Sequence, residues 1–188
     1  MKNAHTRRRR EQANARLRRL VAIDPLTGVY NRTGLEQEVL GDHGRSTVHV
    51  RAFNVDGFKT LNDTYGHVFG DEVLIHLART LAAAVAADTA ATAAGLGPPV
   101  VGRTGGDRFV VIEADPPSPT LADRLRRAVL AFPVGVSVSV GESTGPLADT
   151  TGMWSLIAQA EAALVRPVPP RRTGPGGVAT GTVPPRLG

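Results

Sequence analysis

The side chains best suited to chemistry in this sequence are aspartates and asparagines that stand beside glycines. One group lies between Asn54 and Asp71, and another follows the Gly105-Gly106 pair at Asp107. Carboxylate and amide oxygens are the ligands that hard divalent cations prefer, and they also accept hydrogen bonds. Taken alone, a Gly-Gly-Asp sequence is more often a turn, and Asp71 suits the first turn of a helix. Their chemistry therefore depends on the elements that position them.

The apolar pattern predicts that strands and helices alternate along the chain. Strands are expected at residues 47–55, 100–102, 109–112 and 134–140. Helices are expected at residues 11–23, 33–40, 58–65, 71–94, 121–130 and 153–165. Asn54 then falls at the end of the first strand, and Gly105-Gly106 forms the turn of a hairpin. We therefore expect the two polar groups to lie at the ends of strands.

Length and composition favour one domain of ordinary size with tails. The chain has 188 residues and no cysteine, which excludes disulfides and thiolate metal sites. Its apolar runs are too short for a membrane span, and the basic first residues lack the apolar segment of a signal peptide. These features predict a cytoplasmic protein that has no membrane partner.

Charge is distributed unevenly along the chain. Residues 1–20 hold eight Lys or Arg and one acid, whereas residues 21–165 hold ten bases and sixteen acids. In residues 166–188, eleven of 23 positions are Pro or Gly, a composition typical of disorder. We therefore predict a basic lead-in helix or arm at 1–20, a folded domain at 21–166 and a disordered tail at 167–188.

Three segments resemble the GGDEF family in sequence, order and spacing. They are residues 24–32 (DPLTGVYNR), residues 54–71 (NVDGFKTLNDTYGHVFGD) and residues 103–109 (RTGGDRF). The alternation at residues 137–141 (SVSVG) is also similar to the family's late strand. The resemblance implies an α+β fold with a central, mostly antiparallel sheet of about five strands flanked by helices, as in nucleotidyl cyclases and polymerase palms.

The same resemblance implies a diguanylate cyclase reaction and its partners. In the family, each of two subunits binds one GTP, and the facing nucleotides are joined into cyclic di-GMP with release of pyrophosphate. Phosphoryl transfer of this kind relies on positioning and on charge neutralisation by Mg²⁺ or Mn²⁺. The implied partners are thus GTP and a second copy of the chain.

Family roles fall on three sets of positions. The implied metal ligands are Asn54, the Val55 backbone, Asp56 and Asp107, with Asp107 also the catalytic residue. The implied substrate contacts are Asn62 and Asp71 for guanine, and Gly57, Phe58 and Lys59 for the phosphates. The signature hairpin is Gly105, Gly106, Asp107, Arg108 and Phe109.

Several positions depart from the family pattern. Asn54 and Arg108 replace acids, so the metal site gains a neutral amide and a cation in place of two carboxylates. Asp56, two residues from Asn54, could share its strand face and compensate. The family's phosphate-binding lysine falls at Val168, with Arg172 as a later basic residue.

The inhibitory product site of the family is predicted to be absent. Its arginine and aspartate would fall at Leu96 and Pro99, neither of which carries a charge. Regulation of the domain by its product through those two positions is therefore not expected.

Three function hypotheses follow. The first is a degenerate GGDEF domain that binds GTP, another nucleotide or a partner protein with weak or no synthesis. The second is an active diguanylate cyclase that uses Asp107, Asp56 and the Asn54 oxygen for metal. The third, disfavoured, is a nucleic-acid-associated factor led by the basic residues 1–20.

Overall fold

An antiparallel sheet of four strands, in the order β2-β3-β1-β4, forms the centre of the fold. The computed structural model describes residues 22–41, 46–88, 97–132 and 135–165. The strands are β1 (Thr47–Val55), β2 (Val100–Gly105), β3 (Arg108–Ala114) and β4 (Val138–Pro146). The helices are α2 (Arg32–Gly41), α3 (Phe58–Tyr65), α4 (His67–Ala86), α6 (Pro119–Leu130) and α7 (Thr150–Ala162).

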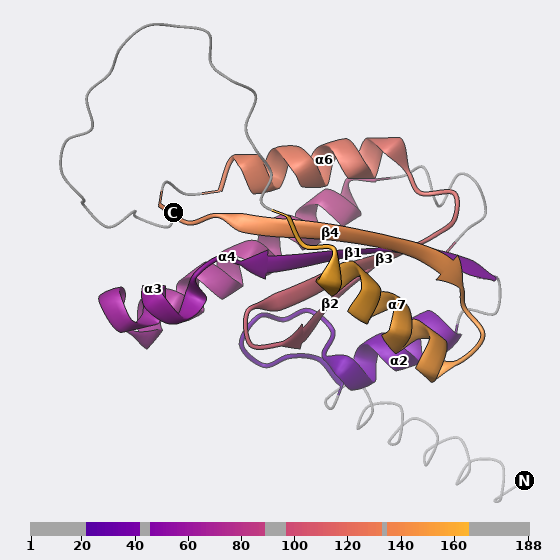
Figure 1. Ribbon diagram of the computed structural model, residues 1–188, viewed down its shortest axis with the longest axis horizontal. Helices are drawn as coiled ribbons and strands as arrows, with labels where there is room; N and C mark the ends of the chain where they lie inside the picture. Colours follow the sequence, from indigo (N-terminus) through magenta and orange to yellow (C-terminus); the bar gives the residue numbers. More distant parts are fainter. Residues whose placement is uncertain (1–21, 42–45, 89–96, 133–134, 166–188) are drawn as a thin grey trace, which may run out of the picture.

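Helices cover both faces of the sheet, α4 and α6 on one and α2 and α7 on the other (Figure 1). The alternation of side chains along β1 divides its residues between these two layers. Phe53 and Val55 pack with α4 and α6, whereas Val48, Val50 and Ala52 pack with α2 and α7. Because β1 is covered on both faces, it is buried along nearly its whole length, although polar residues alternate with apolar ones over its first half.

The α4 and α6 face also holds a buried polar network. Arg51 is buried and forms ion pairs with Glu113, on neighbouring β3, and with Glu142, on neighbouring β4. His49 Nδ1 lies 2.6 Å from Thr144 Oγ1, and burial, followed by the nearby Arg51 charge, lowers the pKa of His49. The network links the central strand to both of its neighbours through charged side chains.

The predicted element order is confirmed, while several boundaries differ. The first strand and the helix at 58–65 have the expected bounds, but α4 begins at His67 and ends at Ala86, not at 71 and 94. Strand β4 runs to Pro146 because its register follows β1 over the whole length of that strand. The described residues form four strands and not the expected five, with Val165 making only an isolated bridge to Val140.

Some predicted segments lie outside the described residues. They are residues 1–20, most of the expected helix at 11–23, the tail at 167–188 with Val168 and Arg172, and Leu96. Among the helices that are described, none combines the length and the apolar character that a membrane span requires.

Candidate functional site

The ends of β1 and β3 bring the two predicted polar groups together. Asn54 pairs with Arg108 across the β1–β3 ladder and with Ser139 across the β1–β4 ladder. The Val55 amide donates to the Asp107 backbone oxygen at 3.3 Å, which fixes the hairpin beside the end of β1. The signature hairpin and the Asn54 segment therefore lie side by side.

Glycines allow the hairpin to turn, and Arg103 holds it in place. Gly105 and Gly106 have φ angles of 156° and 46°, and the second of these lies in the left-handed region that favours glycine. Arg103 donates to the Gly106 backbone oxygen from Nε and Nη2, and to the Asp24 carboxylate from Nη1. The hairpin is thus tied to the turn that precedes α2.

The Asn54 side chain donates a hydrogen bond within the predicted metal site. Its Nδ2 atom lies 3.2 Å from the backbone oxygen of Val55, the carbonyl expected to face a metal ion. An amide nitrogen is a donor and cannot ligate a cation. Asn54 therefore competes with an ion for this carbonyl oxygen, which has two lone pairs.

Arg108 forms an ion pair with Glu161 on α7. Its Nη1 atom lies 2.9 Å from Glu161 Oε2, and half of the Arg108 side chain is exposed. The other Glu161 oxygen accepts a hydrogen bond from the buried Thr104 hydroxyl at 3.1 Å. The positive charge of Arg108 is thus offset by a neighbouring carboxylate, and the hairpin is joined to α7.

Asp56 is held by two serine hydroxyls. Ser137 Oγ donates to one carboxylate oxygen at 2.7 Å, and Ser139 Oγ donates to the other at 2.6 Å. The Asp56 amide also donates to the Ser137 backbone oxygen at 2.8 Å. The carboxylate that could have compensated for Asn54 is therefore fixed against the start of β4.

The groups at this position are a poor fit to the divalent ion that the sequence resemblance implies. Within the described ranges, no group of three or more His, Asp or Glu side chains is placed to hold a metal ion. Asn54 turns a donor toward the Val55 carbonyl, and both Asp56 oxygens already accept hydrogen bonds. Arg108 follows Asp107, so the hairpin turn supplies one carboxylate and not two.

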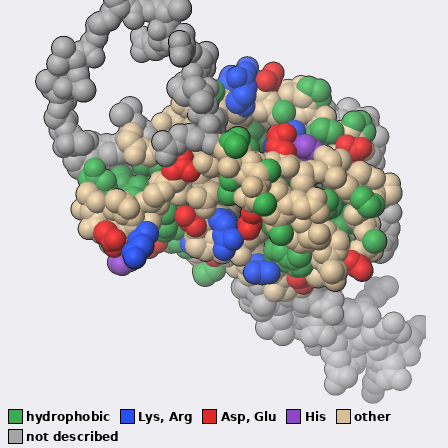
Figure 2. Space-filling view, in the orientation of Figure 1, with side chains coloured by type: hydrophobic (Ala, Val, Ile, Leu, Met, Phe, Trp, Pro, Cys, Tyr) green, Lys and Arg blue, Asp and Glu red, His purple; other side chains and the backbone are tan. Residues whose placement is uncertain are grey.

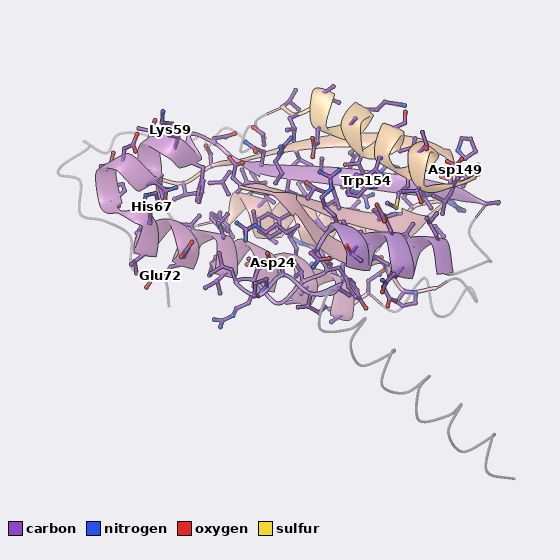
Figure 3. The ribbon with its side chains drawn as sticks, turned by 90° about the horizontal axis from the view of Figure 1, so that it is seen from below. Asp24, Lys59, His67, Glu72, Asp149 and Trp154 are labelled. Carbon is purple, nitrogen blue, oxygen red and sulfur yellow. The ribbon has the colours of Figure 1, made fainter. Side chains whose placement is uncertain are left out.

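The predicted guanine and phosphate positions lie on α3, α4 and the loop before α3. Gly57 precedes α3 with φ of 64°, and Lys59 is exposed in the first helical turn. Figure 3 shows Lys59 at the α3–α4 end of the molecule, far from Trp154. Asn62 is half-buried on α3, and Asp71 is exposed on α4.

Gly70 provides the space that Asn62 occupies. A Cβ atom at Gly70 would collide with Asn62 Oδ1. That oxygen is buried and accepts no hydrogen bond from any residue in the described part of the chain. A buried acceptor without a donor is costly to the folded state.

A cavity of about 470 Å³ lies beside the hairpin. It is lined by the N-terminal end of α2, by the turn that contains Asp24 and by residues 103–106. The cavity thus opens next to the Arg103 and Asp24 ion pair, and neither Asn54 nor Asp107 lines it.

Sequence reasoning missed three residues that shape the site. Glu161 lies within a segment that the sequence marked only as a helix, and Ser137 and Ser139 lie within a segment that it marked only as a strand. Their alternation with valine indicates one face of a strand, but nothing local identifies Asp56 as their acceptor.

Comparison with known proteins agrees with the family resemblance seen in the sequence. The family described as "Diguanylate cyclase, GGDEF domain" matches residues 21–167. An uncharacterized signaling protein of Caulobacter vibrioides is 33% identical over 175 residues, which cover 85% of this chain and 20% of the relative. The probable diguanylate cyclase DgcC of Escherichia coli is 34% identical over 108 residues, which cover 55% of this chain and 26% of DgcC. The chain thus spans about a quarter or less of the length of these two relatives.

A solved structure shares the fold. The diguanylate cyclase SiaD of Pseudomonas aeruginosa, determined in complex with its activator SiaC, superposes with a TM-score of 0.61 at 27% identity. The match covers 86% of this chain and 64% of the SiaD chain. The α+β architecture with an antiparallel sheet is common to both.

Proposed function

Because this chain belongs to the GGDEF family of cyclic di-GMP signalling domains, we propose that it binds a guanine nucleotide with weak or no synthesis of cyclic di-GMP. The observation that carries the proposal is the Asn54 amide, which donates to the Val55 backbone oxygen. This hydrogen bond takes up one of the two lone pairs of an oxygen that a divalent ion would use. The domain is, on this proposal, a degenerate member of its family.

Electrostatics support weak metal binding. Two unit charges 4 Å apart interact by about 4 kcal/mol at an effective dielectric of about 20, so each carboxylate contributes substantially to holding a divalent ion. Asn54 removes one such carboxylate, and Arg108 removes a second. Glu161 offsets the added charge of Arg108, so the loss of acidic ligands is the larger effect.

Retention of the guanine positions supports nucleotide binding. Asn62 and Asp71 offer an amide and a carboxylate, groups that match the donors and acceptors on the edge of a guanine base. We therefore assign the base to Asn62 and Asp71, and the phosphates to the loop at residues 55–59.

The proposal also covers the bounds of the domain, its location, its metal ion and its partners. Residues 21–166 form the folded domain, the location is cytoplasmic, and any residual synthesis uses Mg²⁺ or Mn²⁺ in a homodimer. A partner protein is the second mode of action, since SiaD was crystallised with an activator protein.

Product analysis tests the proposal. The purified 188-residue chain is incubated with GTP and Mg²⁺ or Mn²⁺, and the products are separated by chromatography beside an active diguanylate cyclase. Binding is measured in parallel by calorimetry. We expect GTP binding with little or no cyclic di-GMP. Robust synthesis would establish the alternative, an active diguanylate cyclase, whereas the absence of GTP binding would refute the nucleotide-binding role.

A further inference from the structure

We propose that this site binds the phosphates of its nucleotide without a divalent ion, and that the Arg108 guanidinium serves as the cation. The inference rests on the proposed function, since it names the form of nucleotide that the same site takes. It extends that function by replacing the ion of the family with a side chain of this chain.

Arg108 stands where the bound phosphates are expected. It is the direct cross-strand neighbour of Asn54, and Asn54 precedes the loop at residues 55–59. The hydrogen bond between the Val55 amide and the Asp107 backbone oxygen keeps the hairpin against this loop. The guanidinium is therefore carried by a backbone that is fixed relative to the loop.

Three side chains of the site carry hydrogen-bond donors, and Asp107 contributes a carboxylate. Asn54 contributes an amide nitrogen, Arg108 a guanidinium, and Lys59 an exposed ammonium group. Two of the nearby carboxylates are already engaged, Asp56 by two serine hydroxyls and Glu161 by Thr104 and Arg108. Donors match phosphate oxygens and not a cation, so the fitting ligand is an anion.

Glu161 does not exhaust the donors of Arg108. The described ion pair uses only Nη1, and a guanidinium carries five N–H donors in a planar fork. Half of the side chain is exposed, which leaves it accessible to a ligand. Glu161 thus orients Arg108 and at the same time competes with a phosphate for its charge.

Binding in the presence and absence of metal tests the inference. Calorimetric titration of the full chain with GTP is carried out in EDTA and again in Mg²⁺. We expect dissociation constants that agree within about threefold, a difference of less than 1 kcal/mol. Binding only with Mg²⁺ would overturn this inference and leave the proposed function intact. Binding in neither buffer would overturn both.

Two variants of the ion pair should change affinity in opposite directions. Arg108→Ala should weaken GTP binding in EDTA about tenfold or more, because a hydrogen bond to a charged group is lost. Glu161→Gln should strengthen it, because the competing carboxylate is removed. If both variants weaken binding alike, the pair has only a structural role and the inference fails.

Matched controls separate phosphate contact from misfolding. Arg126→Ala removes an exposed arginine of α6, paired with Asp123 at 3.8 Å, and should leave GTP affinity unchanged. Guanosine, which lacks phosphates, should bind Arg108→Ala as well as it binds the original chain. An equal loss of guanosine and GTP affinity would show that Arg108 does not contact the phosphates. Circular dichroism of each variant confirms that it is folded.

Discussion

The Arg103 guanidinium lies 3.0 Å from the Asp24 carboxylate and joins two motifs that are 79 residues apart in the sequence. Both side chains are largely buried, with 15% and 18% of their surfaces exposed. Arg103 also donates to the Gly106 backbone oxygen, so one side chain connects the turn before α2 with the turn of the hairpin. The position of the signature hairpin therefore depends on the segment that leads into the domain.

Removal of the Asp24 charge should reduce stability in a pH-dependent way. Burial by itself would raise the pKa of Asp24, but hydrogen bonds from Thr27 and Arg103 lower it below its ordinary value. Its stabilisation is then present above the unfolded pKa of about 3.9 and is lost as pH falls through the lower folded value. Asp24→Asn should lower the free energy of unfolding by about 1 to 2 kcal/mol at pH 7. Urea unfolding of the variant should also show a weaker loss of stability as the pH falls into the acid range.

The control for Asp24 is Asp123→Asn, which removes an exposed carboxylate in a long ion pair with Arg126. This change should leave the unfolding free energy almost unaltered. Equal effects of the two variants would contradict the specific contribution of the Asp24 and Arg103 pair.

The two serines that hold Asp56 should stabilise the loop before α3. Replacing both Ser137 and Ser139 with Ala removes two hydrogen bonds to a carboxylate, each of which contributes about 1.5 to 3 kcal/mol. We expect a lower melting temperature and faster hydrogen exchange at residues 55–59. Ser155→Ala, at an exposed position of α7, is the control, and a comparable loss there would count against the assignment.

Gly70 should be required for nucleotide binding and not merely for helix formation. Alanine at this position collides with Asn62 Oδ1, so Gly70→Ala should displace Asn62 and weaken GTP binding about tenfold or more. The matched control is Gly152→Ala in α7, where the nearest atom would lie 3.5 Å from the new Cβ. Calorimetry on both variants checks this, and unchanged affinity in Gly70→Ala would remove Asn62 from the base site.

His49 should make the domain less stable in mild acid. Burial, and then the Arg51 charge, lowers the pKa of His49, so the folded state favours the neutral ring. The unfolded chain takes up a proton near pH 6.5, and stability is lost as pH falls from there through the folded pKa. In urea unfolding at a series of pH values, His49→Gln should reduce the change of the unfolding free energy with pH between pH 5 and 7. An identical slope in the variant would exclude His49 as its source.

Restoring the family's acids at positions 54 and 108 should make GTP binding depend on a divalent metal ion. The combined Asn54→Asp and Arg108→Glu change removes the donor on the Val55 carbonyl and adds two carboxylates. We expect the ratio of GTP affinity in Mg²⁺ to that in EDTA to rise at least about tenfold, because charge neutralisation returns to the ion. A ratio that stays unchanged would show that these two residues do not set the metal dependence of GTP binding.

The sequence by itself determined the family, the order of the elements and the positions of the candidate residues. Apolar periodicity and glycine turns are local properties, so β1 and α3 were predicted with their observed bounds. The motif at residues 103–109 likewise indicated a hairpin, which the structure contains. Boundaries that depend on pairing, such as the C-terminal end of β4, were not predicted, since they follow the length of a neighbouring strand.

Only the tertiary structure decided what the exchanged residues do. Glu161 lies 53 residues from Arg108, and Ser139 lies 83 residues from Asp56, and no local pattern couples positions so far apart. Whether Arg108 repels ions as an unpaired charge or pairs with an acid depends on how α7 packs beside the hairpin. Side-chain chemistry can be read from the sequence, but hydrogen-bond partners are set by which elements the folded chain brings within about 3 Å of one another.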